Sequence, residues 1–145
     1  MTHHDDVKEI KEYYSFIQDE ELRNIFIEAS IVATCTAYKW LQENSTPKFT
    51  VHNANIFGQI TDDRPIDYML DLCGNAYLTL KDLRSVMSKR IKKEKDLLIC
   101  SGRSLALYYV NIQRQEYGLH CASVKAFKEV LDKNNIVTSF HSYID

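Results

Sequence analysis

Glycine and proline are scarce in this sequence, with four and two residues among 145. Sandwiches and barrels need many special turns, which these two residue types supply, so the scarcity argues against such folds and favours long helices. No apolar run reaches the roughly 18 residues that a membrane-spanning helix needs. Because residues 1–6 are polar and acidic, we expect no signal peptide. Because residues 139–145 form no tail anchor either, we expect a cytoplasmic protein without a direct membrane anchor.

Cysteine pairs and an excess of one charge are also missing. Cys35, Cys73, Cys100 and Cys121 lie far apart and none belongs to a Cys-x-x-Cys pair, which favours free thiols in a reducing compartment. The net charge is -2, so nothing draws the whole chain toward nucleic acid or anionic lipid. A length of 145 residues suits one domain, 1–145.

Motifs of catalysis and metal binding do not occur. The sequence has no phosphate-binding glycine loop, no His-Glu-x-x-His and no Gly-x-Ser-x-Gly. The five histidines lack metal-ligand spacing; they are His3, His4, His52, His120 and His141. His120 beside Cys121 is interpreted as a turn residue next to a buried thiol, and the basic stretch 89–95 as a solvated helix face. We therefore expect no enzyme, no metal, no cofactor and no nucleic-acid partner.

Hydrophobic periodicity predicts helices over most of the chain. An apolar stripe at i, i+3, i+4 spacing runs from about residue 20 to residue 43 and ends before Pro47, which cannot continue a helix. Amphipathic helices are also expected at 7–17 and 123–134. Residues 48–62 lack a clean period and are expected to form a loop.

Two further segments are interpreted as helices. One of them starts at Thr61-Asp62-Asp63, where short polar acceptors are followed by Pro65, as is typical of a helix start. The apolar residues from Ile66 to Leu80 would then lie on one face of this helix. Gly74 inside this segment costs about 1 kcal/mol relative to alanine, so we expect a packing reason for it. Residues 136–144 are expected to form a last short helix.

The most hydrophobic segment runs from Leu97 to Ile112 and is apolar nearly all round after Arg103. A helix tolerates this pattern only at the centre of a bundle, so the sequence predicts an all-α bundle of about seven helices around one buried helix. A cation in the first turn of a helix is disfavoured by about a few tenths of a kcal/mol. Arg103 should therefore have an acidic partner, either inside the protein or on a ligand.

Four segments, in order, resemble motifs of the Bcl-2 family. The segment 31–41 resembles the first-helix motif, and 70–75 resembles the Leu-x-x-x-Gly-Asp core of the Bcl homology 3 (BH3) motif. Ser101-Gly102-Arg103 resembles the Asn-Trp-Gly-Arg motif that opens the central helix of that family, and 127–144 resembles its closing helices.

The chain departs from the family pattern at several positions. Asn75 stands where the family usually has Asp, and Cys100-Ser101 replaces Asn-Trp. The interval of 28 residues between Gly74 and Gly102 is shorter than is usual in the family. Residues 1–19 form an extra N-terminal amphipathic segment.

The resemblance implies a Bcl-2-like helical fold, a short, anchorless viral pro-survival homologue and a hydrophobic groove between residues 70–87 and the central helix. That groove would bind BH3 helices of pro-apoptotic proteins, with Arg103 pairing with the Asp of the ligand. The expected partner-binding residues are Tyr77, Leu80, Met87, Ile91, Leu98, Gly102, Arg103 and Ala106. The predicted function is inhibition of apoptosis in a host cell, with recruitment to mitochondria through such partners.

Two alternatives remain open. One is a Bcl-2-like adaptor that modulates innate immune signalling without binding BH3 motifs. The other is an unrelated helical subunit of a complex. An exposed apolar groove also favours self-association, so a homodimer is among the expected states.

Overall fold

The structure is a computed structural model of the chain, and it describes residues 4–47, 49–52, 54–55, 57–60, 67–99 and 102–145. Helices and strands are mixed along this part of the chain. In order, they are α1 (His4–Tyr13), the 3-10 helix η1 (Tyr14–Phe16), α2 (Glu20–Glu43), β1 (Phe49–Val51), β2 (Asp67–Met69), β3 (Gly74–Leu80), α3 (Val86–Lys93), β4 (Leu98–Ile99), β5 (Ser104–Leu105), α4 (Tyr117–Lys133) and β6 (Thr138–Ile144). The predicted all-α bundle is therefore wrong, and the fold is mixed α/β.

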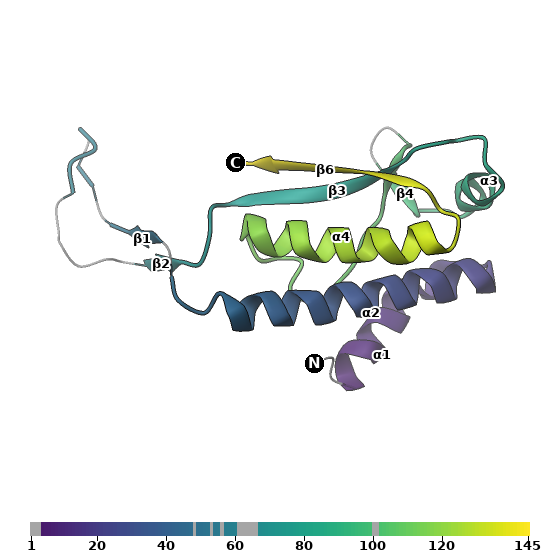
Figure 1. Cartoon of the computed structure of the whole chain (residues 1–145), viewed down its shortest axis with the longest axis horizontal. Helices are drawn as coiled ribbons and strands as arrows, with labels where there is room; N and C mark the ends of the chain where they lie inside the picture. Colours follow the sequence, from purple (N-terminus) through teal and green to yellow (C-terminus); the bar gives the residue numbers. More distant parts are fainter. Residues whose placement is uncertain (1–3, 48, 53, 56, 61–66, 100–101) are drawn as a thin grey trace.

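Among the described residues, four strands form an antiparallel sheet in the order β4-β5-β3-β6. The two long strands, β3 and β6, pair over their full length, from Gly74 opposite Ile144 to Leu80 opposite Thr138. A separate antiparallel pair, β1 and β2, extends away from the sheet and its helices (Figure 1). The long β3–β6 pair is thus the main surface of the sheet.

Helices α1, α2 and α4 lie on one side of the long β3–β6 pair (Figure 1). α4 packs against β3 and β6, and α2 runs antiparallel along the opposite side of α4 (Figure 1). The core between the helices contains Phe26 of α2 and Phe127 of α4, whose ring centroids are 5.9 Å apart. Leu78 of β3 is completely buried beneath the helices. None of the helices in the described ranges is both long and apolar enough to cross a membrane.

The long helix α2 confirms the prediction for residues 20–43. Its first turn contains two glutamates that favour the positive end of the helix dipole. Asp19 caps the helix by accepting a hydrogen bond from the Leu22 amide at 3.2 Å. Arg90 of α3 donates to both carboxylate oxygens of Asp19, at 2.7 and 2.8 Å, and so joins α3 to the start of α2.

The segment predicted as a helix up to residue 80 forms β2 and β3 instead, although its expected start at 61–65 lies outside the described residues. Alternate residues of β3 are buried, because Ala76, Leu78 and Leu80 face the helices. Gly74 has the expected packing reason, since a Cβ there would lie 2.6 Å from the carbonyl oxygen of Tyr143.

The predicted central helix at 105–112 is also wrong. β4 and β5 form a short hairpin, and residues 106–116 follow as an irregular segment. Side-chain hydroxyls replace the helical hydrogen bonds there. Tyr14 donates to the Ala106 carbonyl and accepts from the Tyr108 amide, both at 3.0 Å, while Thr34 accepts from the Val110 amide at 3.0 Å.

The remaining differences lie at element ends. Residues 138–144 form β6 rather than a helix, and the predicted loop 48–62 contains β1. α4 begins at Tyr117, before the predicted start at residue 123, and ends where expected, with Asn134 at its C-cap. The N-terminal segment expected to be an extra is part of the core, because Ile10, Tyr14 and Ile17 are all completely buried.

Candidate functional site: the uncovered face of the sheet

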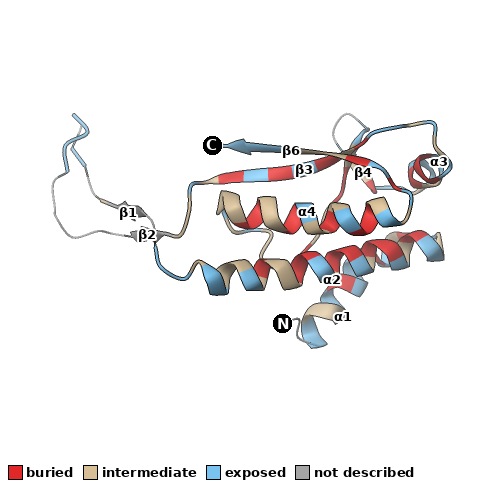
Figure 2. Ribbon diagram, viewed as in Figure 1, coloured by how far each residue is buried: buried red, intermediate tan, exposed pale blue. Residues whose placement is uncertain are grey.

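The two faces of the β3–β6 pair differ in what covers them. The inner face packs against α4, whereas the outer face has no helix or strand over it in the described part of the chain (Figure 1). Buried and exposed residues alternate along β3, and much of β6 is exposed (Figure 2). A sheet face normally lies against another layer, so an uncovered one is a candidate binding surface.

Aromatic side chains from both strands meet on this outer face. Tyr77 and His141 are opposite each other in the ladder, and their rings stack at a centroid distance of 4.9 Å and an interplanar angle of 18°. Thr79 Oγ1 lies 3.0 Å from His141 Nε2, and this hydrogen bond holds the imidazole ring in its orientation. Tyr143 extends the cluster, with its ring centroid 6.5 Å from that of Tyr77.

These aromatic residues remain accessible although they contact one another. Tyr77 is 40% exposed and Tyr143 is 50% exposed. Val137 and Ile99, which are also exposed, add aliphatic surface farther along the sheet. We name Tyr77, His141, Tyr143, Val137 and Ile99 the outer-face cluster. It contains no carboxylate, lysine or arginine, so its centre suits an apolar partner surface.

Positive charge is concentrated at one end of the sheet. Residues 81–103, which include α3 and β4, contain eight basic and three acidic residues, although the whole chain has a net charge of -2. Lys81 follows β3 directly, and Arg103 precedes β5. Both side chains are exposed, and no ion pair of either is found among the described residues. The outer-face cluster therefore has a basic margin.

The residues predicted to line a groove are not brought together on one surface. Tyr77 lies on the outer face, and Leu98 is half-buried on β4. Gly102 and Arg103 lie in the exposed turn between β4 and β5, where Gly102 has a φ of 79°. The other four are buried in the core; they are Leu80, Met87, Ile91 and Ala106.

Arg103 does not occupy the first turn of a helix, so the expected conflict with a helix dipole does not arise. Its carbonyl oxygen accepts a hydrogen bond from the Leu80 amide at 3.0 Å, which anchors the turn to β3. The exposed guanidinium is still available to an acidic group on a ligand. His141, Tyr143 and Val137 of the outer-face cluster were not predicted, because residues 136–144 were interpreted as a helix.

His120, the most buried of the described histidines, is a structural residue. His120 Nδ1 lies 2.5 Å from the Tyr109 hydroxyl, and its Nε2 contacts the carbonyl oxygen of Arg114. Because a carbonyl only accepts, Nε2 donates there and Nδ1 accepts from Tyr109. Burial raises the pKa of the Tyr109 hydroxyl well above its ordinary value. Both side chains are buried and satisfied, which leaves no open position for a substrate.

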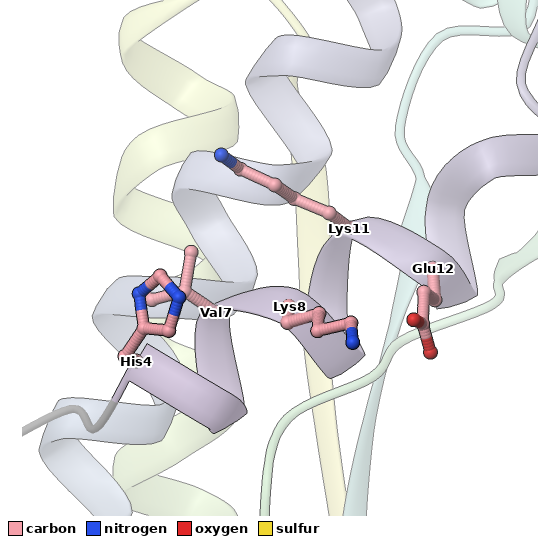
Figure 3. Close-up of a pocket in the computed structure, with 5 residues that line it drawn as sticks. All are labelled: His4, Val7, Lys8, Lys11 and Glu12. Atoms are coloured by element: carbon pink, nitrogen blue, oxygen red, sulfur yellow. The ribbon is translucent and has the colours of Figure 1, made fainter.

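A hollow of about 350 Å³ lies beside α1 (Figure 3). Its lining consists of His4, Val7, Lys8, Lys11 and Glu12. All five belong to one helix, and the ends of their longer side chains point in different directions. The described ranges also contain no group of three or more histidine, cysteine or acidic residues that could hold a metal ion. The outer face of the sheet is thus the stronger candidate.

No protein-family model, curated protein or solved structure matches this chain. The resemblance to the Bcl-2 family therefore stays a prediction, and the candidate site depends on its own geometry.

Proposed function

We propose that this protein is a non-catalytic binding module that holds an amphipathic helix of a partner protein against the outer face of its sheet. The observation that supports this proposal is the outer-face cluster. It presents stacked aromatic and aliphatic side chains on a face that no helix or strand of the described residues covers, while α4 covers the other face.

The spacing of this surface suits a helix. Residues on one face of a strand recur about every 7 Å, since each residue advances about 3.3 Å. Residues i and i+4 of a helix lie about 6 Å apart along its axis, since each residue advances about 1.5 Å. An apolar stripe of an incoming helix can therefore follow the row formed by Tyr143, His141 and Ser139 of β6, just as α4 follows the inner face.

The basic margin of the cluster favours a partner helix that has an acidic residue. Arg103 and Lys81 lie at the end of the sheet away from Tyr143, so an acidic residue at one end of the bound helix would contact them. Complementary charges at the margin of an interface fix orientation and speed association. The partner helix is thus apolar on one side and acidic at one end.

BH3 segments of pro-apoptotic proteins have this chemistry, with apolar anchors at i, i+3/i+4 and i+7 and an Asp. Sequestration of such segments, and hence inhibition of apoptosis in a host cell, is the specific form of the proposal. It uses the sheet face and not a groove between helices. The second candidate function is that of an adaptor in innate immune signalling. In that case the basic margin would bind an acidic helix that is not a BH3 segment.

Titration calorimetry with a panel of BH3 peptides tests this proposal. We expect binding that Tyr77→Ala weakens about tenfold or more, since a buried aromatic contact contributes about 1.5 kcal/mol or more. Tyr13→Ala is the matched control, because Tyr13 is 41% exposed and lies on α1, away from the sheet. Absence of binding by every peptide at micromolar concentrations would rule out the BH3 form.

A second variant tests the charged margin. Arg103→Ala should weaken binding about tenfold, because a charge-assisted contact contributes roughly 1.5–3 kcal/mol. Arg84→Ala is the control, since Arg84 is also exposed and belongs to the same basic segment but precedes α3. Equal affinities of the wild type and both sheet variants would place the bound helix elsewhere on the molecule.

A further inference from the structure

The outer edge of β6 has free backbone hydrogen-bonding groups. Odd-numbered residues of this strand face β3, because the Lys81 amide donates to the Val137 carbonyl and the Asp145 amide donates to the Cys73 carbonyl. The amides and carbonyls of the even-numbered residues therefore point away from the sheet. Among the described residues, those of Phe140, Ser142 and Ile144 have no partner there.

The two edges of the sheet differ in how they are protected. β4 forms the opposite edge and is only two residues long, with Lys95 three positions before it and Arg103 four positions after it. Short length and lysine are both common means of blocking further strand pairing. β6 is seven residues long and contains no proline and no charged residue. Such an edge pairs readily with another strand.

We propose that β6 pairs antiparallel with β6 of a second copy of this chain, so that two four-stranded sheets form one continuous sheet across a two-fold axis. The occupant must be an extended strand, because the open groups are backbone donors and acceptors in a row. A second copy fits because neither strand has a charge that would oppose its own counterpart.

One register pairs the whole strand with itself. In it, His141 lies opposite His141 of the second copy, Phe140 opposite Ser142, and Thr138 opposite Ile144. Each pair of Phe140 with Ser142 then exchanges two hydrogen bonds, and each Ile144 amide donates to the Thr138 carbonyl of the other copy, which gives about six bonds in total. The Thr138 amide adds none, because it already donates to Asp132 Oδ1 at 3.4 Å. The outer-face clusters of both copies would become neighbours on one surface. This inference concerns the edge of the sheet and does not depend on the proposed helix binding at its face.

Analytical ultracentrifugation measures the dimer directly. We expect the wild type to sediment as a dimer at micromolar concentrations and Ser142→Pro as a monomer, because proline removes an amide that faces the open edge. Ser142→Ala is the matched control: it keeps that amide and loses only the hydroxyl contact with Tyr117, so it should remain dimeric. A wild type that stays monomeric up to millimolar concentration overturns the proposal, as does a folded Ser142→Pro variant that stays dimeric.

A crosslink tests the register and does not require proline in the strand. His141→Cys should form a disulfide with its own copy under mild oxidation, because the facing Cα atoms lie about 4.5 Å apart, within the roughly 4.4–6.8 Å that a disulfide spans. Ser139→Cys should not, because its copies would lie about 13 Å apart along the strand. Mass spectrometry of the linked peptides separates these bonds from those of native cysteines. Equal crosslinking of both variants contradicts the proposed pairing.

Discussion

The hydroxyl of Tyr14 joins the N-terminal helices to the irregular segment 106–116. It donates to the Ala106 carbonyl and accepts from the Tyr108 amide, both at 3.0 Å, and its side chain is completely buried. Tyr14→Phe removes this one oxygen and keeps the ring that packs near Phe26. The substitution therefore isolates the two hydrogen bonds from the apolar packing.

The loss of the oxygen leaves one backbone acceptor and one backbone donor without partners. An unsatisfied buried polar group costs about 1–3 kcal/mol, so the loss of both partners should lower the free energy of unfolding by roughly 2–6 kcal/mol. The total stability of a domain is usually about 5–15 kcal/mol, so this loss is a large fraction of it. The lower limit applies where water reaches the Tyr108 amide, since that residue is only half-buried.

Urea unfolding followed by circular dichroism measures this difference in the free energy of unfolding. The unfolding midpoints of the two proteins can be compared when the free energy depends on urea concentration with the same slope in both. Tyr13→Phe is the control, because it removes the same atom from the neighbouring residue, which is 41% exposed. That control should change stability by less than about 0.5 kcal/mol. A Tyr14→Phe protein within about 0.5 kcal/mol of wild type would refute the reasoning that the hydroxyl holds this segment.

Three further predictions concern single positions. Gly74→Ala should destabilise the fold by about 1–3 kcal/mol in the same urea assay, because its Cβ would lie 2.6 Å from the Tyr143 carbonyl oxygen. Burial raises the pKa of Tyr109, so the unfolded state ionises first and stability should fall as pH rises above about 10; the ultraviolet absorbance of its tyrosinate should appear only together with unfolding. The hydrogen bond from Arg90 lowers the pKa of Asp19 below its ordinary 3.8, so that carboxylate stabilises the fold above this pH and ceases to do so below it. Asp19→Asn should therefore show a weaker loss of stability than wild type in acid titrations, and parallel curves would contradict this assignment.

The helices that the sequence predicts correctly are those with a long, unbroken apolar stripe. α2 has such a stripe over several turns, an acidic cap and a proline soon after its end, and each signal indicates the same element. α4 was placed correctly at its end but not at its start. Tyr117 and Gly118 are not typical residues of a helix start, yet the Asp71 carboxylate accepts a hydrogen bond from the Gly118 amide at 2.7 Å. That contact comes from a distant segment.

The strands were missed because short apolar segments fit two periods. In β3, Tyr77 and Leu80 have helical spacing, while Ala76, Leu78 and Leu80 alternate. The length of a segment distinguishes a strand from a helix only when its ends are known. Gly74 is the first residue of β3, but it was interpreted as an interior residue of a longer helix, so the segment was interpreted as too long for a strand. The same ambiguity concealed β6, whose outer residues His141 and Tyr143 complete the candidate site. Tyr77 was named from the sequence, but together with seven residues that the structure does not bring onto one surface with it.

The irregular segment 106–116 shows why local pattern could not have given this fold. A helix there would satisfy its own backbone and leave the hydroxyls of Tyr14, Ser30 and Thr34 buried without these partners. In the structure those hydroxyls bond the backbone of Ala106, Tyr108 and Val110 instead, across 76 to 94 positions in the sequence. Buried polar groups must be paired, so the choice between helix and irregular segment is made jointly by distant residues. The backbone of this segment is thus held at these three residues by side chains of η1 and α2 rather than by the hydrogen bonds of a helix.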